Sequence, residues 1–177
     1  MKMMMRSDVM TQQEKLTRAL KQCEEQLDAL GIHYGDVSEI VVNTRAKKRY
    51  GQCRRRNGGY EINISAVLLD DRVPDVTLRT TVMHELLHTC QGCMNHGAVW
   101  KGLAAKVNQT YGYNVKRASS AEERGIADVV KENNQPKYVF VCENCGMEIH
   151  RYRKSNFTRN YTRYRCGKCK GHLIRKL

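Results

Sequence analysis

Acidic residues are scarce in this chain of 177 residues, and some kinds of segment are missing from it. No apolar run approaches the roughly 20 residues of a membrane-spanning helix, so we expect no membrane association. The Met-rich start, residues 1–10, is interrupted by Arg6 and Asp8, and no apolar stretch of signal length follows it. We therefore expect a cytoplasmic protein, associated with the nucleoid if its source is bacterial, and we expect a monomer.

The shortage of acid leaves a large excess of positive charge. The chain has 31 Lys and Arg against 18 Asp and Glu, which gives a formal net charge of +13 and an isoelectric point near 9.5. Eleven of the basic residues and only two of the acidic ones fall within residues 137–177. Such an excess predicts a polyanionic partner, most often nucleic acid, whereas the alternative is a solvated basic surface without a ligand.

Hydrophobic periodicity predicts an α+β protein with helices and a small antiparallel sheet. The expected helices cover residues 12–30, 76–89 and 97–111. The expected strands cover residues 38–44 and a hairpin over residues 49–64, which turns at Asn57-Gly58-Gly59. In the third helix, Asn95 is the candidate cap and the side chains expected to face inward are Val99, Leu103, Ala104 and Val107.

Composition shifts towards Cys, Tyr and Arg late in the chain, and we place a boundary near Asn134. We therefore expect a domain over residues 10–116, a connector over residues 117–136 and a small module over residues 137–177.

Two histidines four residues apart mark a candidate metal site. His84 and His88 of His84-Glu85-Leu86-Leu87-His88 would lie on one face of a helix, about 6 Å apart along its axis, where both rings can bind one zinc ion. His96 is the best third ligand, because the intervening loop contains Gly92 and Asn95, which suit a chain reversal. Glu85 would take a proton from zinc-bound water and later protonate the leaving amine. The pattern predicts a zinc hydrolase of the peptidase class.

Cys90 and Cys93 lie between the second and third histidines, and two interpretations are open. In the first interpretation they are alternative zinc ligands or a redox lock on the site. In the second they are two small buried residues that brace the loop. We favour the second interpretation, since three histidines already suffice for a catalytic zinc. Cys23 and Cys53 have no partner by spacing, and we interpret them as packing residues.

A second metal site is predicted near the end of the chain. Cys142 and Cys145 are separated by 20 residues from Cys166 and Cys169, which is the spacing of a four-cysteine structural zinc site. Four thiolates close the zinc coordination, so this ion would do no chemistry and would replace the core that a 40-residue module lacks.

Arginine and aromatic residues alternate between these two cysteine pairs. Such interleaving suits phosphate contacts combined with base stacking, although Tyr161, Arg163 and Arg165 also fit ordinary strand patterning. We favour DNA contact of weak sequence specificity, single-stranded DNA included, because no base-reading motif is present. The candidate nucleic-acid-binding residues are Arg151, Arg153, Lys154, Arg159, Arg163 and Arg165.

The chain resembles the SprT-like metalloprotease family, to which Spartan belongs, as a short bacterial-type member. The resemblance rests on His84-Glu85-Leu86-Leu87-His88, on His96-Gly97-Ala98-Val99-Trp100 and on Tyr164-Arg165-Cys166-Gly167-Lys168-Cys169, with support from the hairpin. It implies a minimal zincin-like domain followed by a zinc ribbon, with His84, His88 and His96 as ligands and Glu85 as the catalytic residue.

The family's studied members cut proteins that are bound or crosslinked to DNA. The resemblance therefore implies a zinc endopeptidase with one catalytic and one structural Zn2+, whose partners are DNA and DNA-bound protein substrates. The alternative is a non-enzymatic nucleic-acid-binding or regulatory protein with two structural zinc sites. That alternative requires a fourth ligand, Cys90 or Cys93, at the three-histidine site.

Overall fold

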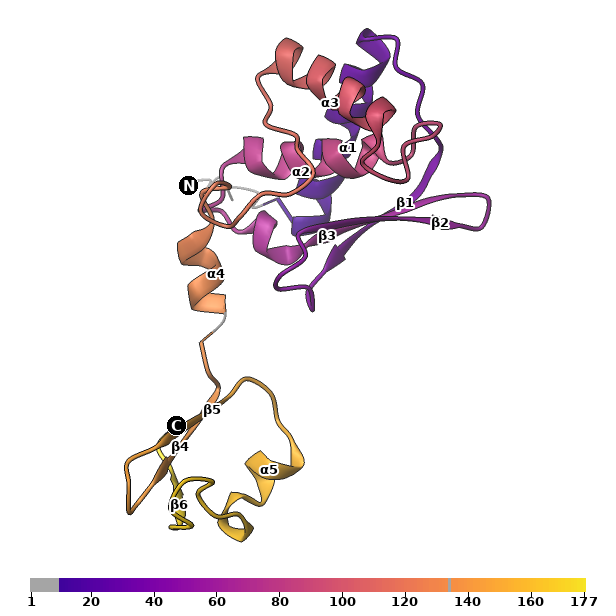
Figure 1. The fold of residues 1–177 in the computed structure, drawn as a ribbon. Helices are drawn as coiled ribbons and strands as arrows, with labels where there is room; N and C mark the ends of the chain where they lie inside the picture. The colour runs from indigo at the N-terminus through magenta and orange to yellow at the C-terminus, as the bar shows by residue number, and fades with distance from the viewer. Residues whose placement is uncertain (1–9, 134) are drawn as a thin grey trace, which may run out of the picture. The chain divides into compact units, whose positions relative to one another are not determined.

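Helix α1, Gln12–Ala29, begins the fold of this computed structural model, which describes residues 10–133 and 135–177 (Figure 1). A capping box starts the helix, since Thr11 accepts a hydrogen bond from the backbone N–H of Glu14 while the Glu14 carboxylate accepts one from that of Thr11. Its apolar stripe is buried at Leu16, Cys23 and Leu27, as the helical spacing predicts.

A three-stranded sheet follows, in the order β1-β3-β2. Its strands are β1 (Val37–Asn43), β2 (Gly51–Arg56) and β3 (Gly59–Ser65). The hairpin β2–β3 is antiparallel as predicted, but β1 pairs with β3 in parallel, so the expectation of a wholly antiparallel sheet is wrong. Local periodicity indicates that a strand exists but carries no signal for the direction of its neighbour.

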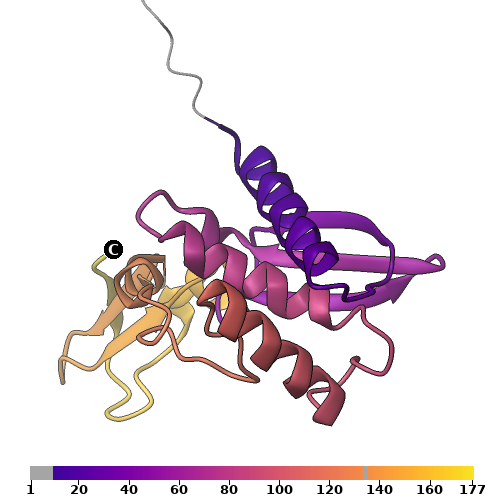
Figure 2. The same ribbon diagram turned by 90° about the horizontal axis from the view of Figure 1, so that it is seen from above.

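Helices α1 and α2 pack on the same sheet, and Figure 2 shows α1 crossing it. The 3₁₀ helix η1 (Ala66–Leu69) leads into α2 (Asp75–Leu87), and α3 (Ala98–Tyr111) packs against α2. Ile62 and Ile64 of β3, both fully buried, belong to the same core as Leu86 and Leu87 of α2. The helix that carries the first two histidines is therefore anchored on the most deeply buried part of this unit.

Two details of α3 differ from the prediction. Val99 is exposed at 57%, because the inward stripe is set by Trp100, Ala104 and Val107 and leaves Val99 outside it. Gly97, and not the expected Asn95, is the N-cap residue of α3. The Asn95 side chain accepts a hydrogen bond from the Gly97 N–H at 3.0 Å but does not cap the helix.

The chain divides into two compact units between Val130 and Lys131. Ile126 and Val129 are buried in the core of the first unit, so the first part of the expected connector, up to Val130, packs as part of that unit. Helix α4 (Ala127–Asn133) spans the division, and Asn134, where we expected the boundary, lies outside the described residues.

The second unit has a three-stranded antiparallel sheet in the order β5-β4-β6. Its elements are β4 (Tyr138–Cys142), β5 (Glu148–Arg151), the short helix α5 (Asn156–Arg159), the 3₁₀ helix η2 (Tyr161–Arg163) and β6 (Leu173–Arg175). Tyr161 and Arg163 thus lie in a helical turn, which rules out the strand patterning considered for them.

Candidate metal centres

The three predicted histidines meet at one point. His84 lies in the last turn of α2, His88 is the residue that ends this helix, and His96 lies just before α3. Their Nε2 atoms form a nearly regular triangle, with 3.3 Å between His84 and His88, 3.2 Å between His88 and His96, and 3.1 Å between His96 and His84.

This triangle has the size that a zinc ion requires. Ligand nitrogens about 2.0–2.1 Å from a tetrahedrally coordinated zinc lie about 3.3 Å from one another. Three neutral imidazoles that direct lone pairs at one point would otherwise repel, so the donor set and its spacing fit a metal. Among residues 10–133 and 135–177, the metal-ligating groups of this kind are the three histidines and the four ribbon cysteines.

Main-chain carbonyl groups set the orientation of two of the rings. His88 Nδ1 lies 2.6 Å from the Cys93 carbonyl oxygen, and His84 hydrogen-bonds to the backbone of Lys116. A ring nitrogen that donates its proton to a carbonyl leaves Nε2 unprotonated and available to a metal. The loop between the second and third histidines therefore positions the second one.

Trp100 forms the floor beneath the three rings. Its side chain is 1% exposed, its ring centroid lies 4.6–5.6 Å from each of the three imidazole centroids, and it is stacked on His88. Burial in this apolar setting, followed by the proximity of His88 and His96, lowers the pKa of His84 to about 3. The pKa of His96 is also lowered, again chiefly by burial. Both rings are thus held neutral, the state in which imidazole binds a metal.

The two loop cysteines are buried, at 4% and 0% exposure for Cys90 and Cys93. Burial raises the pKa of the Cys90 thiol to about 11 and also raises that of Cys93, so both are protonated near neutral pH. In the part of the chain that the structure describes, the three-histidine group contains no sulfur. The arrangement agrees with the interpretation of the pair as bracing residues, with the Cys93 carbonyl as the contact to the site.

Glu85 lies on the same turn of α2 as His84, and its exposure is 6%. Burial raises its pKa to about 7, against the opposing effects of a hydrogen bond from the Cys53 backbone and of the charges on Arg124 and Arg49. A carboxylate with a pKa near 7 can both accept and return a proton at neutral pH. Gly51 of β2 leaves room for it, because a Cβ at this position would lie 2.3 Å from Glu85 Oε1.

Arg124 is a residue of this environment that the sequence did not indicate. Its Nη1 donates to Thr81 Oγ1 at 2.7 Å, one turn before Glu85 on α2, and its guanidinium lies 5.3 Å from the ring centre of Tyr50. The Arg124 Nε is buried without a hydrogen-bond partner in the described structure. No periodic pattern or motif singles it out, since it comes from the loop after α3 and approaches from a distant part of the chain.

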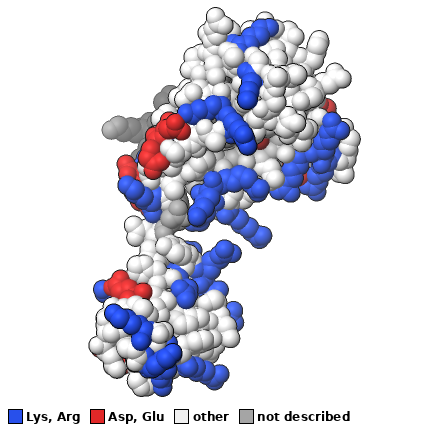
Figure 3. All heavy atoms as spheres, viewed as in Figure 1, with Lys and Arg blue, Asp and Glu red and all other residues white. Residues whose placement is uncertain are grey.

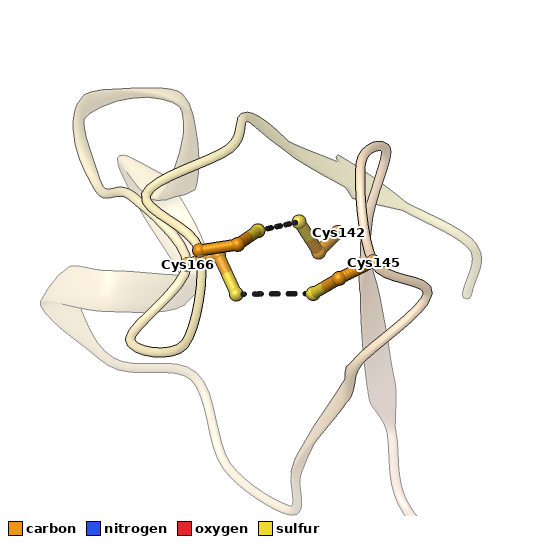
Figure 4. Close-up of side chains that lie close together, drawn as sticks. Cys142, Cys145 and Cys166 are labelled. Atoms are coloured by element: carbon orange, nitrogen blue, oxygen red, sulfur yellow. Dashed lines mark hydrogen bonds between the residues drawn. The ribbon is translucent and has the colours of Figure 1, made fainter.

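The four predicted cysteines of the second unit also converge. The Sγ atoms of Cys142 and Cys169 are 3.4 Å apart, and those of Cys145 and Cys166 are 3.6 Å apart (Figure 4). Backbone N–H groups of Cys169 and Lys168 lower the pKa of Cys166 to about 6, which favours the thiolate that a metal needs. Four sulfurs at this spacing are typical of a closed, structural zinc site.

All six predicted nucleic-acid-binding residues, from Arg151 to Arg165, are exposed in the second unit. The aromatic residues that lie near these six in the sequence separate into two groups. Phe157 and Tyr161 pack on the buried Phe140, with ring centroids 5.0 Å away, whereas Tyr152 and Tyr164 are 53% and 39% exposed. The second pair is the more exposed, although the Tyr164 ring lies edge-on to Phe157 with 5.0 Å between the ring centroids. The Arg151 guanidinium lies 4.9 Å from the centre of the Phe157 ring.

The sequence profile of the SprT-like family matches residues 14–119, which include all three histidines and Glu85. The chain belongs to the SprT-like family. This family is associated with zinc-metalloprotease-type domains, in agreement with the three-histidine site. A search of curated proteins found no match. Within residues 10–133 and 135–177, no helix of this SprT-like chain is both long and apolar enough to cross a bilayer.

Proposed function

We propose that this chain is a zinc-dependent endopeptidase that cleaves proteins bound or crosslinked to DNA, with its basic zinc ribbon in contact with the DNA. One observation carries the proposal. Three Nε2 atoms lie 3.1–3.3 Å apart, and the residue next to the first histidine is a buried carboxylate with a pKa near 7. This combination supplies the ligands and the base that hydrolysis of a peptide bond requires.

His84, His88 and His96 would hold the catalytic zinc, and Cys142, Cys145, Cys166 and Cys169 the structural one. A bound catalytic zinc lowers the pKa of its water to about 7 and polarises the substrate carbonyl. Glu85 accepts the proton of the attacking water and later donates it to the leaving amine. The Cys53 N–H orients the Glu85 carboxylate, and the absence of a side chain at Gly51 lets it lie against β2.

Contact with DNA is supported by the chemistry of the second unit. Its exposed arginines suit phosphate groups, while Tyr152 and Tyr164 offer ring faces for base stacking. Binding of this kind is sensitive to salt and reads little sequence.

The peptidase chemistry is tested by Glu85→Gln. Glutamine has nearly the same shape but accepts no proton, so cleavage of a DNA-binding protein should fall by about 10²–10⁴-fold while the zinc content stays at the wild-type value. Glu25→Gln, an exposed carboxylate of α1, is the matched control and should cleave normally. Wild-type cleavage by Glu85→Gln would refute the mechanism.

The substrate class is tested separately, with wild-type protein, a DNA-binding protein and single- or double-stranded DNA. We expect cleavage that depends on DNA and that a chelator abolishes. Equal cleavage with and without DNA would refute the DNA-linked substrate class and leave the peptidase chemistry intact.

A further inference from the structure

Positive charge in the first unit is concentrated in one short segment. Residues 45–56 contain seven Lys and Arg and no acidic residue, whereas the remainder of residues 10–130 contains ten Lys and Arg against fourteen Asp and Glu. The first unit is therefore net acidic apart from these twelve residues. We call the seven side chains the hairpin cations; they are Arg45, Lys47, Lys48, Arg49, Arg54, Arg55 and Arg56.

All seven hairpin cations are exposed. They lie on the loop between β1 and β2 and on the end of β2, and Figure 3 shows Lys and Arg gathering over this part of the first unit. Arg56 is engaged with Glu61 and lies 3.8 Å from Glu39, and the segment itself supplies no carboxylate to its seven cations. Like charges at this density repel unless a polyanion lies against them.

The turn of the hairpin adds an aromatic surface to this charge. The Arg55 guanidinium lies 5.7 Å from the ring centre of the half-buried Tyr60, and both residues line a shallow hollow together with Arg56 and the turn 57–59. A hollow with a cation, an aromatic ring and turn backbone fits a phosphate and the base attached to it.

Protection of a sheet edge explains only part of this pattern. β2 is an edge strand, and charged side chains on an edge prevent pairing with another chain. Arg54, Arg55 and Arg56 serve that purpose, but Arg45, Lys47, Lys48 and Arg49 precede the strand and protect no edge. Four of the seven cations thus need another explanation.

We infer that the hairpin cations form a second nucleic-acid-binding surface, on the protease unit, which binds the backbone of single-stranded nucleic acid and stacks a base at Arg55 and Tyr60. This surface is made of residues other than the ribbon arginines, and it requires neither zinc chemistry nor cleavage. Its failure is therefore distinguishable from failure of the proposed peptidase function.

The test is binding of a fluorescent 30-nucleotide oligothymidine to the full chain, measured by anisotropy between 50 and 200 mM salt. The variant is Lys47→Gln/Lys48→Gln/Arg55→Gln, which leaves the Arg56–Glu61 pair in place. The charge-matched control is Arg18→Gln/Lys21→Gln/Lys101→Gln, three exposed cations on α1 and α3.

We expect the hairpin variant to bind about 10–100-fold more weakly at 100 mM salt, with a salt slope reduced by about 0.7 for each phosphate that the protein no longer neutralises. The control should stay within about twofold of wild type. Thermal unfolding of both variants excludes misfolding as the cause.

Wild-type affinity and slope in the hairpin variant would overturn the inference, and formation of larger particles by that variant would then assign Arg55 to edge protection. An affinity loss of equal size in the control would also overturn it, since it would show a general charge effect. A 30-base-pair duplex is the comparison ligand. Loss of duplex binding with single-strand binding unchanged would overturn the single-stranded assignment.

Discussion

At the scale of single residues, Gly51 links the sheet to the reacting carboxylate. Alanine at this position would bring a Cβ to 2.3 Å from Glu85 Oε1, with the two preceding carbons of that side chain only 2.8 Å away. We expect Gly51→Ala to displace Glu85, to reduce cleavage at least tenfold and to destabilise the fold by about 1–3 kcal/mol. Activity and urea unfolding measure the two effects.

Gly102→Ala is the control for this substitution, because a Cβ there meets no atom within 4 Å and the residue lies inside α3. It should leave cleavage unchanged and stabilise the helix by about 0.5–1 kcal/mol. If Gly51→Ala cleaved and unfolded like Gly102→Ala, the close approach of β2 to Glu85 would not be needed for cleavage.

Which residues of the site could be predicted depends on their separation along the chain. His84, Glu85 and His88 follow from the repeat of one helix, and His96 from a short loop, so local geometry suffices. Gly51, Cys53 and Arg124 reach Glu85 from other segments through β2 pairing and the loop after α3. Nothing in their own sequence context distinguishes them from packing or surface residues.

At the scale of elements, the turn between η1 and α2 depends on one carboxylate. Asp70 accepts hydrogen bonds from Arg72 Nε and Nη2, both at 2.8 Å, and from the Arg72 backbone N–H at 3.1 Å. The hydrogen bonds from the Arg72 side chain, and after them the one from its backbone N–H, lower the pKa of Asp70 from 3.8 to about 2. The ionised form therefore stabilises the folded state, and its contribution is complete above pH 4.

We expect Asp70→Asn to reduce the free energy of unfolding by roughly 0.5–1 kcal/mol at pH 7. Since the folded pKa lies below the unfolded one, the difference from wild type should shrink as pH falls from 4 through 2. Asp71→Asn, whose side chain is 97% exposed, should have little effect at any pH. A deficit that persists unchanged at pH 2 would contradict this assignment.

Helices α1, α2 and α3 and strands β1, β2 and β3 were predictable to within a few residues, because hydrophobic period and turn residues are local signals. The parallel pairing of β1 with β3 was not, since strand direction is decided by how α1 and α2 cover the sheet. The short helices α5 and η2 were not predictable for a similar reason: they turn Phe157 and Tyr161 inward to Phe140.

At the scale of the whole molecule, the two units differ in how much apolar core they possess. The first unit buries residues from every one of its helices, whereas the second buries only the side chains of Phe140, Cys142, Cys166, Leu173 and Thr158 among its described residues, with a few half-buried neighbours. A core of that size cannot offset the conformational entropy of some 40 residues. We therefore expect the second unit to depend on a metal held by its four cysteines.

Removal of zinc by a chelator should unfold residues 131–177 and leave the first unit folded. Limited proteolysis with mass spectrometry should show new cuts confined to the second unit, reversed when zinc is restored. Protection of β4 and β6 that survives complete metal removal would show that the ribbon folds on protein contacts alone. Cuts within α1 would contradict the independence of the first unit.

The hydrogen bond from His88 to the Cys93 carbonyl has a consequence for the order in which activity is acquired during folding. The three histidines lie within a short stretch of chain, and the carbonyl that positions His88 belongs to the loop that joins the second and third of them. Contacts this local form early in folding, whereas the contacts of Glu85 with β2 require segments distant in sequence to meet. If the chain is a metallopeptidase as proposed, it would therefore form its three-histidine site before the complete arrangement for hydrolysis is in place.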